Sequence, residues 1–185
     1  MPLTGKGTGH LNYEFKAKAA DINLLQKILE AHNPEYIGED HQVDTYFNVP
    51  QGRLKLREGN IENALIYYER PDTADAKRSD VILYPHTPQQ GLKDILVKVH
   101  GVKAIVDKKR KIYFIGNVKF HFDTVATLGS FVEVEAIDRN GEFGLPHLMA
   151  QCKSYAELFN IRPADYISVS YCDLVATAAP QTNPS

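Results

Sequence analysis

Hydrophobic and polar residues alternate over much of the chain. Because successive side chains of a strand point to opposite faces, this alternation predicts strands with one apolar face. The segments that show it, bounded by turn-forming residues, are 11–18, 40–48, 52–58, 63–70, 78–84, 102–115, 118–125 and 131–138. Gly116-Asn117, between two of these segments, is typical of a two-residue hairpin turn.

Three other segments place apolar residues three and four positions apart, which is the period of an amphipathic helix. The first begins at Asp21, a typical N-cap residue, and ends before Pro34. The second begins at Pro88, and the third covers residues 144–159. Strands joined mostly by short connections and interrupted by these helices predict an α+β fold with a mainly antiparallel sheet.

The ends of the chain differ from its middle. Residues 1–10 and 176–185 are small or polar and have little to bury, so we expect a flexible N-terminus and a disordered tail. The segment between them, 11–175, contains no linker and is expected to be a single domain. With 185 residues in all, the chain is long enough for one sizeable core.

Composition excludes several classes of protein. The formal net charge of −2 gives no general attraction to nucleic acid or to anionic membranes. No apolar run approaches the roughly 18–20 residues of a membrane helix, and the start lacks the apolar segment of a secretory signal. Cys152 and Cys172 form neither a disulfide framework nor a metal-binding spacing. We therefore expect a cytoplasmic protein that binds no nucleic acid and no membrane, and a homodimer is left open.

The polar faces of the predicted strands are charged, and mostly with one sign to each strand. Each strand alone would fit a sheet with one solvated face. Like charges at positions i and i+2 repel, however, so an open surface gains nothing from such runs. The charged faces are formed by Glu14, Lys16 and Lys18, by Arg53, Lys55 and Arg57, by Lys108 and Arg110, and by Glu133 and Glu135.

A sheet closed around a polar interior explains this segregation of charge. Cationic strands would bind phosphate oxygens, arginine through its planar fork and lysine as a point charge. Carboxylate strands would bind a hard cation such as Mg²⁺ or Mn²⁺. Metal and phosphate would then neutralise charges that are otherwise costly to bury. We therefore expect a closed eight-stranded antiparallel β-tunnel, or barrel, with helices packed outside.

The order and spacing of these segments resemble the CYTH superfamily of triphosphate tunnel metalloenzymes, which includes class IV adenylyl cyclases and thiamine triphosphatases. The resemblance covers residues 11–173, and Asp44 to Arg57 looks more like the cyclase branch. The segments that carry it are Glu14-Phe15-Lys16-Ala17-Lys18, Asp44-Thr45-Tyr46-Phe47, 52–57, Tyr68-Glu69-Arg70, 106–110 and 118–135.

Motif matching to this family implies two sets of site residues. The candidate ligands of Mg²⁺ or Mn²⁺ are Glu14, Asp123, Glu133 and Glu135. The candidate phosphate-binding residues are Lys16, Lys18, Arg53, Lys55, Arg57, Arg70, Lys108 and Arg110. Among both sets, the residues expected to act in catalysis are Glu14, Lys18, Arg57, Lys108 and Arg110.

The resemblance implies a metal-dependent enzyme that acts on a small triphosphate. The leading expectation is a reaction like that of class IV adenylyl cyclases, from ATP to cyclic AMP and pyrophosphate. The alternative is a triphosphatase for thiamine triphosphate, tripolyphosphate or a nucleoside triphosphate. The family motif Glu-x-Glu-x-Lys on the first strand reads here with Lys16 in place of the second glutamate. That departure leaves a non-catalytic binder of nucleotide or polyphosphate as a third hypothesis.

Overall fold

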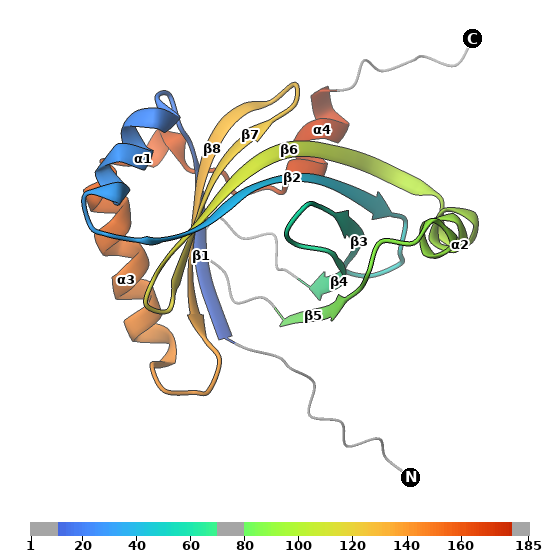
Figure 1. Ribbon diagram of the computed structural model, residues 1–185, viewed down its shortest axis with the longest axis horizontal. Helices are drawn as coiled ribbons and strands as arrows, with labels where there is room; N and C mark the ends of the chain where they lie inside the picture. The colour runs from blue at the N-terminus through green and yellow to red at the C-terminus, as the bar shows by residue number, and fades with distance from the viewer. Residues whose placement is uncertain (1–10, 70–79, 179–185) are drawn as a thin grey trace.

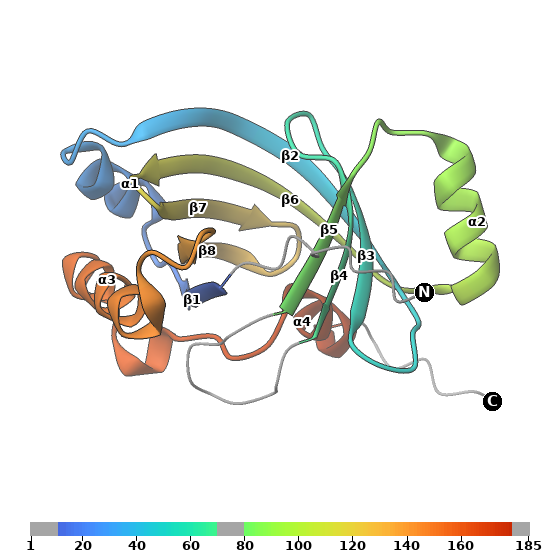
Figure 2. The same ribbon diagram turned by 90° about the horizontal axis from the view of Figure 1, so that it is seen from below.

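The computed structural model describes residues 11–69 and 80–178, and within them eight strands form one antiparallel sheet. The strand order is β1-β8-β7-β6-β2-β3-β4-β5, and the sheet curves strongly (Figures 1 and 2). The strands are β1 Leu11–Lys18, β2 Glu35–Phe47, β3 Arg53–Glu58, β4 Ala64–Glu69, β5 Asp80–Pro85, β6 Val102–Ile115, β7 Val118–Val125 and β8 Gly129–Asp138. The α+β class and the antiparallel sheet are therefore confirmed.

Four α-helices and one short 3₁₀ helix accompany the sheet in the described residues. They are α1 Ile22–Glu30, α2 Gln90–His100, α3 Gly144–Leu158, the 3₁₀ helix Pro163–Asp165, and α4 Tyr171–Ala178. The predicted cap of α1 is present, because the Asp21 side chain accepts a hydrogen bond from the Leu24 backbone N–H at 3.0 Å. Helix α4 was not predicted, and it extends beyond the predicted domain boundary at residue 175.

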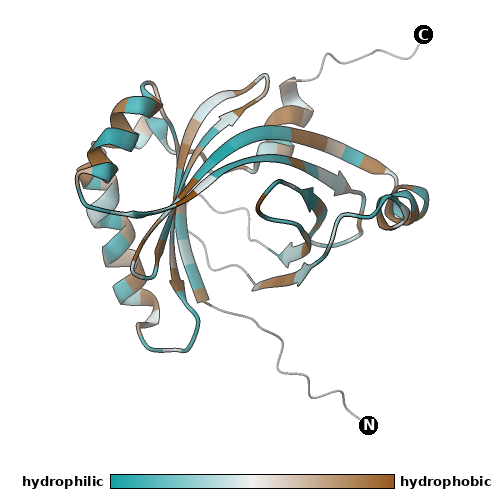
Figure 3. Cartoon of the chain, in the orientation of Figure 1, coloured by the Kyte–Doolittle hydropathy of each residue, from teal (hydrophilic) through white to brown (hydrophobic). Residues whose placement is uncertain are grey.

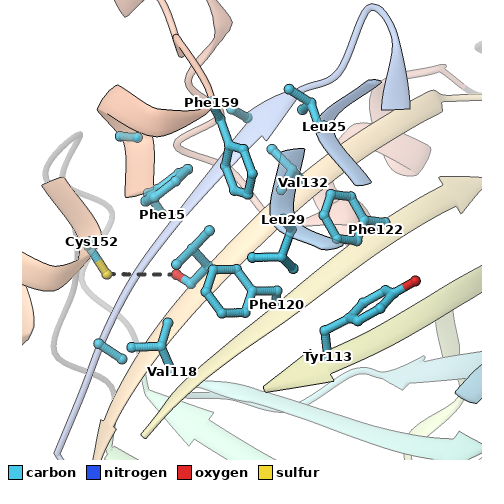
Figure 4. Packing of buried hydrophobic residues seen from close by; sticks show 14 of the residues in the cluster. Phe15, Leu25, Leu29, Tyr113, Val118, Phe120, Phe122, Val132, Cys152 and Phe159 are labelled. Carbon is cyan, nitrogen blue, oxygen red and sulfur yellow. Dashed lines mark hydrogen bonds between the residues drawn. The ribbon is translucent and has the colours of Figure 1, made fainter. Parts of the chain in front are cut away.

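The outer face of the sheet holds the largest core, beneath α1 and α3 (Figures 1 and 4). Leu25 and Leu29 of α1 and Phe159 after α3 pack against Phe120 and Phe122 of β7. Hydrophobic and hydrophilic residues are mixed along the same strands (Figure 3), as alternation requires. The apolar face therefore packs outward under helices, which leaves the charged face for the inside of the curve.

Helix α3 is fixed to the sheet by Cys152. This thiol is buried and donates a hydrogen bond to the Tyr13 carbonyl at 3.3 Å. Burial is the main reason that the pKa of Cys152 rises to about 12, so the thiol stays protonated at neutral pH. The residue is a packing element, in agreement with the absence of a reactive or metal-binding cysteine pattern in the sequence.

Helix α2 buries only part of its apolar side chains against the sheet. Leu96 packs against Phe47 and Leu56, but Ile95 and Val99 are 62% and 68% exposed. Their side chains lie on the part of the helix that turns away from the sheet. None of the helices in the described ranges is long and apolar enough to cross a membrane.

The predicted closure of the barrel is not found in the hydrogen-bonded sheet. Within residues 11–69 and 80–178, β1 and β5 are its two edges. The segment before α4 lies on the edge of β1 instead: Ile167 N–H donates to the Lys16 carbonyl at 2.9 Å, and Tyr166 forms a bridge with Ala17. The chain that follows α3 therefore covers an edge that a closed barrel would pair with β5.

Strand β2 begins at Glu35, before the start predicted at residue 40. Its pairing with β6 shifts register between Tyr36 and Gly38, which hides the regular alternation in the sequence. Gly38 has φ 148°, and a Cβ there would meet Ile61 Cδ1 at 2.8 Å. The longer β2 carries Asp40 and Asp44 along the inner face, where they organise the site described next.

Candidate functional site

The inner face of the curved sheet lines a cavity of about 510 Å³. The strands β1, β3, β6 and β8 direct their charged positions into it, because these alternate with the core positions. The strands β4 and β5 contribute an apolar side formed by Ala64, Ile66, Val81 and Leu83. The predicted site residues that line the cavity are Glu14, Lys16, Lys55, Arg57, Lys108, Arg110, Glu133 and Glu135.

One side of the cavity gathers three cations around a single carboxylate. Asp44 on β2 is 1% exposed and accepts hydrogen bonds from Arg57 Nε and Nη2, both at 2.9 Å. It also accepts from Lys55 Nζ at 3.0 Å and from Lys108 Nζ at 2.9 Å. Arg57 also donates to Glu62, which in turn accepts from Lys119, so two carboxylates face four cations on this side of the cavity. The excess of positive charge suits a polyanion.

Burial changes the proton affinity of these groups. It is the main reason that the pKa of Lys108 falls to about 7 and that of Lys55 to about 8, against the opposing effect of Asp44. Burial alone would raise the pKa of Asp44, but Arg57, Lys55 and Lys108 outweigh it and hold that pKa well below its ordinary value. Asp44 is therefore ionised, while Lys108 titrates near neutral pH.

Arg110 on β6 joins the cationic side to the acidic side. Its Nε and Nη2 donate to Asp123 Oδ1 and Oδ2 at 2.7 and 2.6 Å, and Nη2 also donates to Glu133 Oε2 at 3.0 Å. The hydroxyl of Tyr171 on α4 donates to Asp123 Oδ2 at 2.7 Å. Both oxygens of Asp123 are thus engaged behind Arg110, and the cavity lining does not include it. The geometry makes Asp123 a residue that orients Arg110.

The acidic side of the cavity is built by β1 and β8. Glu14 and Glu135 are register partners in this strand pair. Burial, and then the negative charge of Glu14, raise the pKa of Glu135 to about 7. Asn12 also lies on this side and donates its Nδ2–H to Glu135 Oε1. The Oδ1 atom of Asn12 has no hydrogen-bond partner among the described residues, although Asn12 is only 4% exposed.

Lys16 lies between the two sides of the cavity. It is the register partner of Glu133, and its Nζ lies 4.0 Å from the centre of the Tyr171 ring. His121 of β7 also lines the cavity, with Nδ1 3.6 Å from Glu133 Oε2. Burial, and then the charge of Arg110, lower the pKa of His121 to about 4, so its imidazole is neutral at physiological pH. In the middle of the cavity, Glu133 is therefore flanked by the cations Lys16 and Arg110 and by the neutral His121.

The loop between β3 and β4 adds Glu62 to the cavity. The Asp40 carboxylate accepts hydrogen bonds from three successive backbone N–H groups that end at Glu62, at 2.6–2.9 Å. Glu62 in turn accepts from Arg57 Nη1 at 3.0 Å and from Lys119 Nζ at 2.5 Å. This carboxylate links β3 to β7 across the curve of the sheet and holds two cations in place.

Three predicted site residues lie outside the cavity lining, and a fourth, Arg70, is not among the described residues. Lys18, the last residue of β1, is exposed and outside the cavity lining. Arg53 contacts Asp173 of α4 at 3.0 Å and also lies outside the lining. Asp123 is held behind Arg110, and Arg70 lies outside the described residues, as do the predicted flexible start and the last part of the predicted tail.

Sequence reasoning missed several polar residues at the site, among them Asp44, Asn12, Glu62 and Tyr171. Asp44 belongs to a segment that carries the family resemblance, but it was not among the predicted site residues. Its position two residues before Tyr46 places both on the inner face of β2. Asn12 had a readable signal, because it lies two positions before Glu14 on the same face of β1. Glu62 lies in a loop and Tyr171 on an unpredicted helix, so strand alternation could not reveal either residue.

The described residues contain no group of three or more His, Cys, Asp or Glu side chains placed to hold a metal ion. The predicted four-carboxylate set is therefore not brought together. Glu14, Glu133 and Glu135 remain on the acidic side, and Asp123 is engaged with Arg110. Carboxylate oxygens are nevertheless the donors that Mg²⁺ and Mn²⁺ prefer, and the partnerless oxygen of Asn12 lies beside them. In donor chemistry, this side fits a hard divalent cation.

Comparison with known proteins agrees with this architecture. The profile of the CYTH domain matches residues 10–154. Adenylate cyclase CyaB of Aeromonas hydrophila is 26% identical over 190 residues, which cover 96% of this chain and 96% of that protein.

Two solved structures show the same fold. The PH1012 protein of Pyrococcus horikoshii OT3 superposes with a TM-score of 0.77 and 22% identity, covering 89% of this chain and 99% of that one. HpAC1 from Hippeastrum, described as having a dominant triphosphatase activity, gives 0.64 and 11% identity, covering 91% and 95%. At 22% and 11% sequence identity, these two structures support a shared fold and no more.

Proposed function

The chain belongs to the CYTH domain family, and on that premise we propose that it is a metal-dependent enzyme acting on a triphosphate, with the conversion of ATP to cyclic AMP and pyrophosphate as its leading reaction. The observation that carries the proposal is the excess of positive charge around Asp44, where Lys55, Arg57 and Lys108 share one carboxylate. A triphosphate would supply the missing negative charge.

The apolar side of the cavity favours an organic triphosphate over inorganic tripolyphosphate. Ile66 and Leu83 line the cavity beside the charged strands, and Leu83 is 45% exposed. An inorganic polyphosphate has no group that gains from contact with these residues, whereas a nucleoside does. Together with the similarity to CyaB, this supports ATP as substrate and cyclisation as the reaction.

The residues of the cavity have distinct roles in such a reaction. Lys55, Arg57 and Lys108 would bind the phosphate chain, and Arg110, oriented by Asp123, would stabilise charge on the departing pyrophosphate. The acidic side, with Glu14 and Glu135, would hold a divalent metal that neutralises phosphate charge and activates the attacking oxygen. In cyclisation the 3′-hydroxyl oxygen forms the new bond to the α-phosphorus, its proton is released to solvent, and the bond from that phosphorus to pyrophosphate breaks.

Turnover of ATP tests the proposal directly. Purified protein with ATP and Mg²⁺ or Mn²⁺ is expected to release cyclic AMP and pyrophosphate in equal amounts, measured by chromatography and a coupled pyrophosphate assay. A sample without divalent metal is the control and should give neither product. Binding of ATP without any product from ATP, thiamine triphosphate or tripolyphosphate would reject an enzymatic function and leave the non-catalytic binder.

The second candidate function is a triphosphatase. It is supported by the description of HpAC1, which shares the fold. The cationic cluster around Asp44 would bind the phosphate chain whether the attacking group is the 3′-hydroxyl or water. In that reaction water attacks the terminal phosphorus and orthophosphate is released. The same assays distinguish the two candidates, because release of orthophosphate without cyclic AMP would overturn the cyclase proposal and select the hydrolase.

The low pKa of Lys108 predicts a pH dependence of anion binding. A bound polyanion favours the charged ammonium, so binding above pH 7 must take up a proton at Lys108, whose pKa is about 7, and above pH 8 another at Lys55, whose pKa is about 8. Affinity for tripolyphosphate at constant ionic strength is therefore expected to be highest below pH 7, where both lysines are charged, and to fall as the pH rises, by up to about tenfold per pH unit for each lysine.

Isothermal titration calorimetry between pH 6.5 and 9 measures this effect, and buffers of different ionisation enthalpy report the proton uptake. The Lys108→Met variant is the matched control, because its affinity should be lower near pH 7 and its pH slope shallower. An affinity that stays constant from pH 7 to 9 in the wild type, with no proton uptake, would contradict the prediction.

A further inference from the structure

We propose that Asn12 supplies a ligand oxygen to the divalent cation, so that the metal site consists of Asn12 Oδ1 with carboxylate oxygens of Glu14 and Glu135. The inference deepens the proposed function, since it rests on the metal dependence proposed above. It differs from the four-carboxylate set predicted from sequence by adding an amide oxygen and by leaving out Asp123.

The first observation is the state of the Asn12 side chain. Asn12 is 4% exposed and lines the cavity, its Nδ2–H is used by Glu135 Oε1, and its Oδ1 has no partner among the described residues. Buried polar atoms are nearly always hydrogen-bonded or bound to a ligand, because an unsatisfied one is costly. An amide oxygen that lies in a polar cavity without a protein partner is available to a ligand that enters the cavity.

The second observation is the chemistry around that oxygen. Glu135 accepts a hydrogen bond from Asn12, and Glu14 is the register partner of Glu135 on the same side of the cavity. The neighbouring cation on β7, Lys119, is directed to Glu62 at 2.5 Å. Two carboxylates and one amide oxygen form an oxygen-only donor set, which selects Mg²⁺ or Mn²⁺ over softer metals. A hydrogen-bond donor would satisfy Oδ1 alone, whereas a divalent cation would use Oδ1 together with the carboxylate oxygens beside it.

The same placement gives a different alignment of the first-strand motif. Asn12, Glu14 and Lys16 line the cavity, whereas Lys18 is exposed and outside it. The pattern Glu-x-Glu-x-Lys therefore fits the cavity as Asn12-x-Glu14-x-Lys16, with asparagine at the first position. The chain then departs from the motif by exchanging a carboxylate for a neutral oxygen donor, and Lys16 occupies the lysine position. On this alignment Lys16, which motivated the hypothesis of a non-catalytic binder, no longer departs from the motif.

Binding of Mn²⁺ alone, followed by the electron paramagnetic resonance signal of free Mn²⁺, tests the inference without any substrate. Asn12→Leu removes the oxygen and is expected to weaken Mn²⁺ binding by about tenfold or more. Asn12→Asp keeps an oxygen at the same place and adds charge, so it is expected to bind Mn²⁺ more tightly than the wild type. If Asn12 acted only as a donor to Glu135, the aspartate variant would lose that donor and gain no affinity.

Thr45→Val is the matched control, because Thr45 is 1% exposed and its Oγ1 also lacks a partner, but it lies outside the cavity lining. Its Mn²⁺ affinity should equal that of the wild type. Circular dichroism checks that each variant folds, and if Asn12→Leu does not fold, the aspartate variant decides. An aspartate variant that binds Mn²⁺ no more tightly than the wild type, or a folded leucine variant with unchanged affinity, overturns the inference.

The outcome of the Mn²⁺-binding experiment can be told apart from the outcome of the ATP-turnover experiment. Mn²⁺ binding that depends on Asn12 in a protein with no turnover would reject the proposed enzyme and retain the metal site. Turnover of ATP together with Mn²⁺ binding that is insensitive to Asn12 would retain the enzyme and reject this ligand set.

Discussion

Replacing Asp44 by asparagine is expected to lower the free energy of unfolding by about 3–5 kcal/mol, because it removes one partner of a buried charge cluster. Lys55, Arg57 and Lys108 all donate to this carboxylate, and Lys108 is 1% exposed. Asparagine has nearly the same shape, so the loss comes from charge and not from packing. Urea denaturation followed by circular dichroism measures it.

The control for this variant is Asp107→Asn. Asp107 lies on β6 and pairs with His41 at 2.8 Å, but both side chains are about half exposed. The change should therefore cost less than about 1 kcal/mol. If Asp44→Asn lowered the free energy of unfolding as little as Asp107→Asn does, Asp44 would not be the main counter-charge of the cationic side of the cavity.

Tripolyphosphate should rescue the Asp44 variant. A polyanion bound beside the same cations replaces part of the lost counter-charge, so the ligand is expected to raise the melting temperature of Asp44→Asn more than that of the wild type. Equal shifts in the two proteins would place the phosphate chain away from Lys55, Arg57 and Lys108.

Replacing Lys108 by methionine is expected to have opposite effects on activity and on stability. The side chain that replaces the lysine has a similar length, and it removes one of three cations that share Asp44. Loss of a cation that stabilises phosphate charge in the transition state should lower kcat by about 10²–10³-fold. The free energy of unfolding should stay the same or rise, because burial already disfavours the charged form of Lys108.

Lys109→Met is the matched control for that variant. Lys109 is the next residue of β6, and its side chain is exposed on the other face of the strand. Turnover and stability should both stay close to the wild type. If Lys108→Met kept the wild-type kcat, or if it lost stability together with activity, Lys108 would be a structural residue and not part of the phosphate site.

Much of the sheet was predictable because its signal is local. The β6–β7 hairpin at Gly116-Asn117 and the cap of α1 at Asp21 were predicted and are present. Strand β2 was predicted too short, since its register shift near Gly38 breaks the alternation. Helix α4 was not predicted. Its Tyr171 contacts Asp123 and its Asp173 contacts Arg53, and such contacts between segments far apart in the sequence leave no periodic pattern.

The candidate site was predictable in its type of chemistry but not in its pairings. Strand alternation placed Lys55, Arg57, Lys108 and Arg110 on one inner face, and the structure brings them to one cavity. Asp44 and Asp123 look alike in the sequence, because each is an aspartate within a predicted strand. Packing makes one of them the shared partner of three cations and the other the support of Arg110.

The sequence by itself determined that charged residues would share one face of an antiparallel sheet, because alternation along a strand is a property of the backbone alone. Which charges meet was decided by the tertiary structure, through strand order and the curvature of the sheet. Register brings Glu14 to Glu135, and curvature brings Glu62 to Lys119. The same packing lays residues 166–167 on the edge of β1, so among the described residues the hydrogen-bonded sheet stays open where a closed barrel was predicted.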